Sequence, residues 1–432
     1  MLNLLCDVTS VIRTVGHVLL ALVVLLFMVL IHETGHYTAG KILGFQINEF
    51  AIGMGPKIFS KKKKNGEVFS VRIFPLGGFC AFEGEDADKD NPRAFNNQKP
   101  WKRLIVLFAG AFFNFVSAIL IAIIAFSCYG DTVAKVSTVY DYAPTENLQL
   151  QSGDIIYKIN GRRVFVLDNI SRYMTDGEMK FTVLRATEGG KYVSVELDGI
   201  QKGNFTSAIV SKIDCAVDPS NGRELQAGDT IYKLNGYSLG QKGDFEKYRN
   251  AAIQASLETC TLTVSTGDKT YDYTVATSDI ANGKFVVAES AYSGVGMAIR
   301  YDKHRFNFGE SLLRAFPYCG EVGMLVLRTL GGLITGAVGV DQVGGPITTI
   351  SLTTQVVSTG LANILMLIVL ISVNLAVFNL LPVPALDGCR MVFVLIEWIA
   401  GKPINRKVEA YINAIGLILL IVLMVVIDLL KL

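Results

Sequence analysis

Residues 18–40 read VLLALVVLLFMVLIHETGHYTAG, an apolar run that ends in two histidines and a glutamate. With its flanks, from about Val15 to Ala39, the segment is long enough to span a bilayer. A secretion signal is the alternative, because Arg13 precedes the run, but the apolar residues continue into the polar motif without a cleavage site. Because ionisable groups inside a span are costly, they indicate a functional site.

The composition of the whole chain is that of a membrane protein. Of its 432 residues, 51% are hydrophobic and only 18% are charged. The net charge of +2 gives no reason to expect a nucleic-acid partner. The seven cysteines form no C-x-x-C pair and are interpreted as small apolar residues, although a disulfide between Cys215 and Cys260 is possible.

Three further segments are predicted to span the membrane, at about Leu104–Tyr129, Leu361–Leu381 and Tyr411–Leu430. Basic residues gather in the loop before the second span and in the loop before the fourth. Both loops are therefore predicted to be cytoplasmic, which places both termini and residues 130–355 outside the cytoplasm. The basic residues are Lys61–Lys64, Lys99, Lys102 and Arg103 in the first loop, and Lys402, Arg406 and Lys407 in the second.

The loop after the first span is predicted to contain a β-hairpin over about residues 48–83. The sequence INEFAIGMGPKIFSKKKKNGEVFSVRIFPLGGFCAFEGED (47–86) has the pattern of two short strands joined by KKKKNG. Asn65-Gly66 favours a tight turn with positive φ. The lysines indicate a solvated turn or a cytoplasmic signal, and the apolar residues suggest that the hairpin lies against the membrane or the helices.

The middle region contains a repeat. LQSGDIIYKING (150–161) and LQAGDTIYKLNG (225–236) match at nine of twelve positions. Each copy predicts a turn, a strand and a second turn, so we expect two β-rich domains, at about 130–205 and 206–290, with the second the weaker copy. Residues 291–355 are predicted to be a linker and an interfacial amphipathic helix, because Arg314, Glu321 and Arg328 share one helical stripe.

The sequence HETGH predicts a zinc site. His32 and His36 lie four residues apart, so on a helix both imidazoles can face one metal ion. Glu33 is adjacent and can accept a proton from a metal-bound water. A chance match with ordinary buried histidines is the alternative, but the chain has only four histidines and two of them are in this motif.

A catalytic zinc usually has three protein ligands, and Asp387 is the predicted third. It follows the Pro-x-Pro of NLAVFNLLPVPALDGCR (374–390), at the end of the third span. Prolines end the helix, and irregular backbone at this depth is tolerated where it is buried or lines a wet cavity. An ordinary loop aspartate is the alternative. Of the two remaining histidines, His17 lies earlier on the same segment, and His304 lies in the region predicted to be outside the cytoplasm.

Four motifs together resemble the site-2 protease family of intramembrane zinc metalloproteases, in its bacterial branch of regulator-of-sigma-E proteases. They are HETGHYTAG (32–40), PLGGF (75–79), NLLPVPALDG (379–388) and the Gly-Asp…Asn-Gly pattern of PDZ domains between them. The resemblance implies a polytopic α-helical membrane protein of the bacterial plasma membrane. It would have about four transmembrane helices, a membrane-associated β-hairpin and an extracytoplasmic PDZ-like region that gates access to the site.

The resemblance also implies roles for individual residues. It makes the hairpin the surface that binds substrate in extended form by strand pairing. The active site would lie toward the cytoplasmic side. The resemblance implies His32, His36 and Asp387 as the zinc ligands and Glu33 as the general base. It implies Asn379, Pro382 and Pro384 as substrate-binding residues.

The predicted function is zinc-dependent endoproteolysis inside the membrane. The substrate would be a single-span membrane protein already trimmed outside the bilayer, such as an anti-sigma factor or a signal-peptide remnant, and lipid would be the other partner. Residues 1–129 and 356–432 would carry the four spans and the zinc site. A PDZ scaffold or receptor with a structural zinc, and a metal transporter, are the alternatives.

Overall fold

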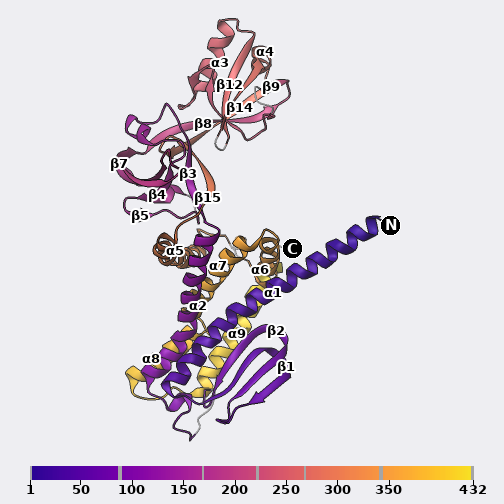
Figure 1. Ribbon diagram of the computed structural model, residues 1–432, viewed down its shortest axis with the longest axis vertical. Coiled ribbons are helices and arrows are strands. Elements are labelled where there is room, and N and C mark those ends of the chain that lie inside the picture. Colours follow the sequence, from indigo (N-terminus) through magenta and orange to yellow (C-terminus); the bar gives the residue numbers. More distant parts are fainter. Residues whose placement is uncertain are drawn as a thin grey trace. The chain divides into compact units, whose positions relative to one another are not determined.

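The computed structural model describes residues 2–85, 90–167, 170–219, 223–266, 269–339 and 344–429. The chain forms two compact units, one of Met1–Gly130 with Arg305–Leu432 and one of Asp131–His304. The first unit holds the long helices and one β-hairpin, and the second holds two larger sheets (Figure 1).

Four helices among the described residues are long and apolar enough to cross a membrane, as the sequence predicts. They are α1 (Leu2–Leu43, with Val15–Leu43 as its candidate span), α2 (Pro100–Cys128), α7 (Leu361–Leu380) and α9 (Arg406–Leu429). Helix α7 ends where Pro382 follows, because proline has no N–H for a helical hydrogen bond.

Among the described residues this unit also has the α-helices α5 (Phe308–Thr335), α6 (Pro346–Val357) and α8 (Asp387–Ala400). Neither α6 nor α8 was predicted. The amphipathic helix was predicted, but its charged stripe is not solvated along its length. Arg314 is 1% exposed, and its guanidinium lies 4.8 Å from the centre of the Phe306 ring and 6.0 Å from that of Phe126. Stacking on aromatic faces lets the charge lie inside the bundle, against α2.

The predicted hairpin is present, but its strands are long and bent rather than short. Strand β1 (Ile47–Lys62) and strand β2 (Val68–Phe82) pair in more than one register: Phe69 of β2 is paired with both Phe50 and Lys61. The first residues of β2, 68–71, therefore lie between the two halves of β1. Gly53 lies at the bend with φ +81°, and a Cβ there would meet the Phe74 carbonyl oxygen at 2.5 Å.

This folding leaves residues 78–82 as one edge of the small sheet. They pair with residues 47–52 on one side, and among the described residues no strand pairs with their other side. A Cβ at Gly40 of α1 would lie 2.4 Å from the Phe82 ring. The glycine therefore allows this end of β2 to pack directly on α1.

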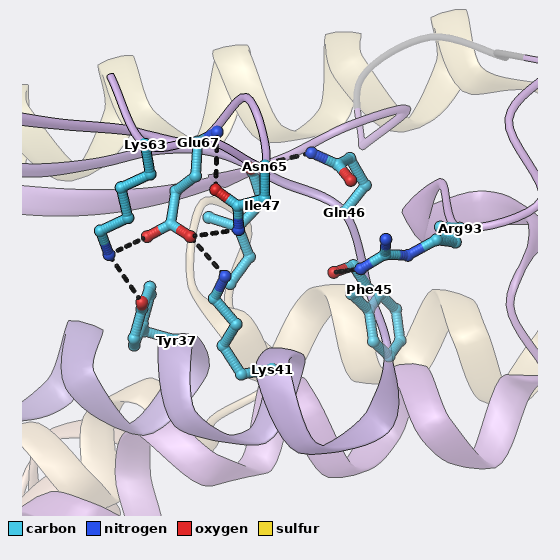
Figure 2. A network of polar contacts seen from close by, with 9 residues as sticks. All are labelled: Tyr37, Lys41, Phe45, Gln46, Ile47, Lys63, Asn65, Glu67 and Arg93. Atoms are coloured by element: carbon cyan, nitrogen blue, oxygen red, sulfur yellow. Dashed lines mark hydrogen bonds and ion pairs between the residues drawn. The ribbon is translucent and has the colours of Figure 1, made fainter. Parts of the chain in front are cut away.

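The turn of the hairpin is fixed to α1 by a buried carboxylate (Figure 2). Glu67 is 0% exposed and accepts hydrogen bonds from Lys41 of α1, from Lys63 Nζ at 2.7 Å and from Asn65 Nδ2 at 3.2 Å. The Lys63 ammonium also donates to the Tyr37 hydroxyl of α1 at 3.1 Å. Lys63 thus has an attachment role beyond the solvated turn that the sequence suggests.

The second unit contains two antiparallel sheets. The first has the order β15-β3-β4-β6-β7, with β5 beside β4, and the second has the order β14-β8-β10-β12-β13-β9, with β11 beside β10. Their strands are β3 (Asp131–Val139), β4 (Ile155–Ile159), β5 (Arg162–Arg163), β6 (Glu178–Ala186), β7 (Tyr192–Gln201) and β15 (Met297–His304), and β8 (Gly203–Ile213), β9 (Val217–Pro219), β10 (Thr230–Leu234), β11 (Tyr237–Ser238), β12 (Thr259–Thr266), β13 (Lys269–Ala276) and β14 (Phe285–Gly294). Helices α3 (Asp244–Gln254) and α4 (Thr277–Ala281) accompany the second sheet.

The repeated twelve residues make the same turn in both sheets. Asn160 and Asn235 both adopt positive φ, at 49° and 51°. The Asn160 side chain accepts a hydrogen bond from the Lys180 backbone at 2.9 Å, and the Asn235 side chain accepts one from the Thr261 backbone at 2.7 Å. The repeat in sequence is therefore a repeat in local structure.

The boundaries of the two β-rich parts differ from those drawn on the sequence. Residues 291–304, assigned there to the linker, continue β14 as far as Gly294 and then form β15. Strand β15 pairs antiparallel with β3, from Met297 opposite Val139 to His304 opposite Asp131. The chain thus returns to the first sheet after completing the second, a long-range pairing that no local pattern marks.

Candidate functional site

The site begins where α1 and α2 touch. A Cβ at Gly35 of α1 would lie 2.3 Å from the Ala109 carbonyl oxygen, and a Cβ at Gly110 of α2 would lie 2.5 Å from His36 Nε2. Real Cβ atoms do not approach so closely, so only glycine permits this contact. The backbone of α2 consequently lies directly against the imidazoles of α1.

Three predicted ligands come together at this contact. His32 Nε2 lies 3.0 Å from Asp387 Oδ2, His36 Nε2 lies 3.2 Å from the same oxygen, and the two nitrogens are 3.1 Å apart. Tetrahedral zinc with bonds of about 2.0–2.1 Å separates its ligand atoms by about 3.3 Å. The donor types and their spacing therefore fit a zinc ion with three protein ligands.

Asp387 reaches the histidines through a tight turn after α7. Gly388 follows it in the first turn of α8, and a Cβ there would lie 2.2 Å from the Leu381 carbonyl oxygen. Ala385 has φ +73°, which is unusual for a residue with a side chain. Its N–H donates to Asn413 Oδ1 of α9 at 3.1 Å. Helix α9 thus stabilises the turn that presents the carboxylate.

The electrostatics of this end of α8 favour a metal-binding carboxylate. Burial by itself would raise the pKa of Asp387, but protonated imidazoles at His32 and His36 attract the carboxylate, outweigh burial and hold the pKa below its usual range. A zinc ion bound at the same place would supply that positive charge instead of the protons. The ionised form is the one that coordinates a metal. On the other side of the site, His36 Nδ1 donates to the Val106 carbonyl oxygen at 2.8 Å, which leaves Nε2 free as a ligand.

A cavity of about 620 Å³ opens beside the three ligands. Its lining includes Glu33, the edge residues 79–82 of β2, and Asn379 of α7. The Cys80 backbone lies close enough to Glu33 to act electrostatically on its carboxyl group. The predicted base, the three ligand residues and the free sheet edge therefore face one space.

The other predicted substrate residues have a different place. Among the described residues that line the cavity, neither Pro382 nor Pro384 occurs. Pro384 instead packs against α9, where a Cβ at Gly416 would lie 2.1 Å from the proline Cβ. The two prolines belong to the turn that carries Asp387, and their contact with substrate stays a prediction.

Sequence reasoning missed several residues around the site. Asn413 and Arg390 line the cavity, and Arg390 forms an ion pair with Glu85 after the hairpin. Asn114 of α2 is buried beside His32. For Asn114 there was a signal, because it is a polar residue inside an apolar span and lies four residues after Gly110.

Comparison with known proteins gives a consistent result. The model of peptidase family M50 matches residues 20–423. The zinc metalloprotease RasP of Bacillus licheniformis is 28% identical over 428 residues, covering 93% of this chain and 94% of that protein. The regulator of sigma-W protease RasP of Bacillus subtilis is 29% identical over 441 residues, with 93% and 94% covered.

Proposed function

This chain belongs to peptidase family M50 and is a zinc metalloprotease, and on that premise we propose that it cuts transmembrane segments of other membrane proteins within the bilayer. One observation carries the proposal: His32, Glu33 and His36 lie within an apolar helix of spanning length, and together with Asp387 of α8 they face a cavity beside a free strand edge. A soluble protease would have no use for such a helix at its metal site.

In the proposed mechanism His32, His36 and Asp387 hold the zinc. The bound metal would lower the pKa of a water molecule and polarise the scissile carbonyl. Glu33 accepts the proton of that water and later donates it to the leaving amine. Glu33 and Cys80 line the same cavity, so the base lies beside the edge strand on which the substrate is proposed to bind.

Substrate binding is proposed to use the edge residues 78–82. A transmembrane helix hides its carbonyl groups in hydrogen bonds, so the segment must unwind before it is cut. An extended segment that pairs with the edge would regain backbone hydrogen bonds and present one peptide bond to the metal site. Asn379, which lines the same cavity, would bind the backbone of the substrate on the opposite side.

The proposed location is the bacterial plasma membrane, with the metal site toward the cytoplasm. The basic loops at residues 61–64 and 402–407 support this orientation. The relative named as a regulator of sigma-W protease suggests an anti-sigma factor as substrate. Such a substrate would be a single-span protein already shortened outside the membrane. For the β-rich unit we propose a PDZ-like role in selecting it.

The test is cleavage of a tagged single-span substrate co-expressed with the full chain. Glu33→Gln is expected to abolish cutting and to retain zinc, whereas Asp387→Ala is expected to lose both. Glu188→Gln, at an exposed turn of the other unit, is the matched control and should behave like the wild type. Cutting by Glu33→Gln at the wild-type rate would refute the role of Glu33. A wild type that binds zinc and cuts no membrane substrate would instead favour the scaffold alternative.

A further inference from the structure

One face of α2 supplies contacts to the outer nitrogens of both histidines. Val106, Gly110 and Asn114 follow one another at intervals of four residues, so they share that face. Gly110 lies against the imidazoles themselves. One turn before it the Val106 carbonyl oxygen binds His36 Nδ1 at 2.8 Å. One turn after it the Asn114 amide lies 3.4 Å from His32 Nδ1.

Asn114 is held firmly in this place. The residue is 0% exposed, and its backbone carbonyl oxygen accepts hydrogen bonds from Ser117 Oγ at 2.8 Å and from Ser372 Oγ at 2.9 Å. Its amide directs Nδ2 toward His32, and Oδ1 has no partner among the described residues. A buried amide in an apolar span is costly, which calls for a role that an apolar residue cannot fill.

The proton on His32 decides which end of the amide is needed. A neutral imidazole carries one proton, and a metal bound at Nε2 requires that proton to be on Nδ1. The Nδ1–H group then needs an acceptor, as His36 has in Val106. The two ends of a carboxamide are alike in shape, so a half-turn of the Asn114 amide places Oδ1 where Nδ2 lies.

We propose that Asn114 Oδ1 accepts the Nδ1–H of His32 when zinc is bound, and that Asn114 thereby fixes the tautomer and the ring orientation of this ligand. Asn114 is a positioning residue, because it acts on the metal through His32. The inference rests on the zinc site of the proposed function, but it does not depend on which substrate is cut.

The experiment measures zinc affinity of the detergent-solubilised full chain by competition with a chelator. Asn114→Leu removes the acceptor at similar volume and is expected to weaken zinc binding about 10- to 100-fold. Asn114→Asp retains an acceptor oxygen and is expected to stay within about threefold of the wild type. Asn374→Leu is the control: it removes another asparagine of a membrane helix whose Oδ1 has no partner among the described residues, and it should leave the affinity unchanged.

The outcomes separate positioning from packing. Wild-type zinc affinity in Asn114→Leu would overturn the proposal, and so would an equal loss in Asn114→Leu and Asn114→Asp, because a purely steric role would not be rescued by an acceptor. If Asn114→Leu fails to fold, a zinc affinity of Asn114→Asp near that of the wild type supports the proposal, and a loss greater than tenfold overturns it. Since zinc is measured without substrate, failure here is distinct from failure of the protease proposal, which Glu33→Gln tests.

Discussion

Replacing Gly110 with alanine should destroy the metal site while leaving the helices intact. The new Cβ would lie 2.5 Å from His36 Nε2 and 2.6 Å from His32 Cε1, where ordinary contacts begin at 3.4 Å. The imidazoles or α2 would have to move by about 0.9 Å, whereas zinc–ligand distances tolerate about ±0.2 Å. We therefore expect Gly110→Ala to bind zinc at least about 100-fold more weakly, since a displaced ligand is lost rather than weakened.

The same substitution should not unfold the helix in which it lies. Alanine is favoured over glycine inside a helix by about 0.5–1 kcal/mol. Gly320→Ala in α5 is the matched control, because nothing lies within 4 Å of a Cβ there. Both variants should therefore keep the helical circular dichroism of the wild type, and only Gly110→Ala should lose zinc.

The assay combines zinc content of the purified protein with chelator competition and with cleavage of a tagged membrane substrate. Zinc content and cleavage should fall together in Gly110→Ala and stay at wild-type levels in Gly320→Ala. A Gly110→Ala protein that binds zinc as tightly as the wild type would refute the reasoning. It would mean that the two helices can separate at their closest contact without disturbing the ligands.

Three further sets of substitutions probe other parts of the molecule. Glu67→Gln leaves two partly exposed lysines without their counter-charge, and should lower the free energy of unfolding by about 1–3 kcal/mol. Burial would raise the pKa of Glu67, but its lysine and asparagine partners lower it to about 2. The free energies of unfolding of the wild type and Glu67→Gln should therefore differ by a constant amount from pH 5 to 8, above the unfolded pKa of about 4.3. Denaturant titrations should show this difference vanish as the pH falls through about 2. Ala385→Val places a β-branched residue at positive φ, which should lower the free energy of unfolding by about 1–2 kcal/mol and weaken zinc binding by displacing Asp387. Ala385→Gly should retain zinc, because glycine adopts positive φ without strain. Equal zinc affinities of the two variants in a chelator assay would contradict this. Asn160→Ala and Asn235→Ala each remove a turn hydrogen bond and should lower thermal stability to a similar extent, and an effect confined to one of them would show that the two turns are not equivalent.

Features that depend on neighbouring residues could be predicted from the sequence. The four apolar helices follow from runs of apolar residues that exceed the thickness of a bilayer. The hairpin follows from Asn65-Gly66 between two apolar stretches, and the repeated turns follow from their matching residues. The motif at His32–His36 predicted the metal because helical spacing alone sets two imidazoles on one face. Each of these signals lies within a few turns of chain.

Features that depend on distant residues appeared only in the tertiary structure. Asp387 meets His32 across 355 positions of sequence. Its place after the Pro-x-Pro break and the motif resemblance made Asp387 a candidate ligand, but neither determines the distance between the two side chains. The return of β15 to β3, the burial of Arg314 and the folding of β1 around β2 had no local signal at all. The sequence shows Asn114 as a single polar residue in an apolar segment but does not show its hydrogen-bond partner. Hydrogen bonds between helices depend on how closely the helix backbones approach, which the tertiary structure determines. Here glycines at the crossing of α1 and α2 set that distance, and the metal site exists because of it.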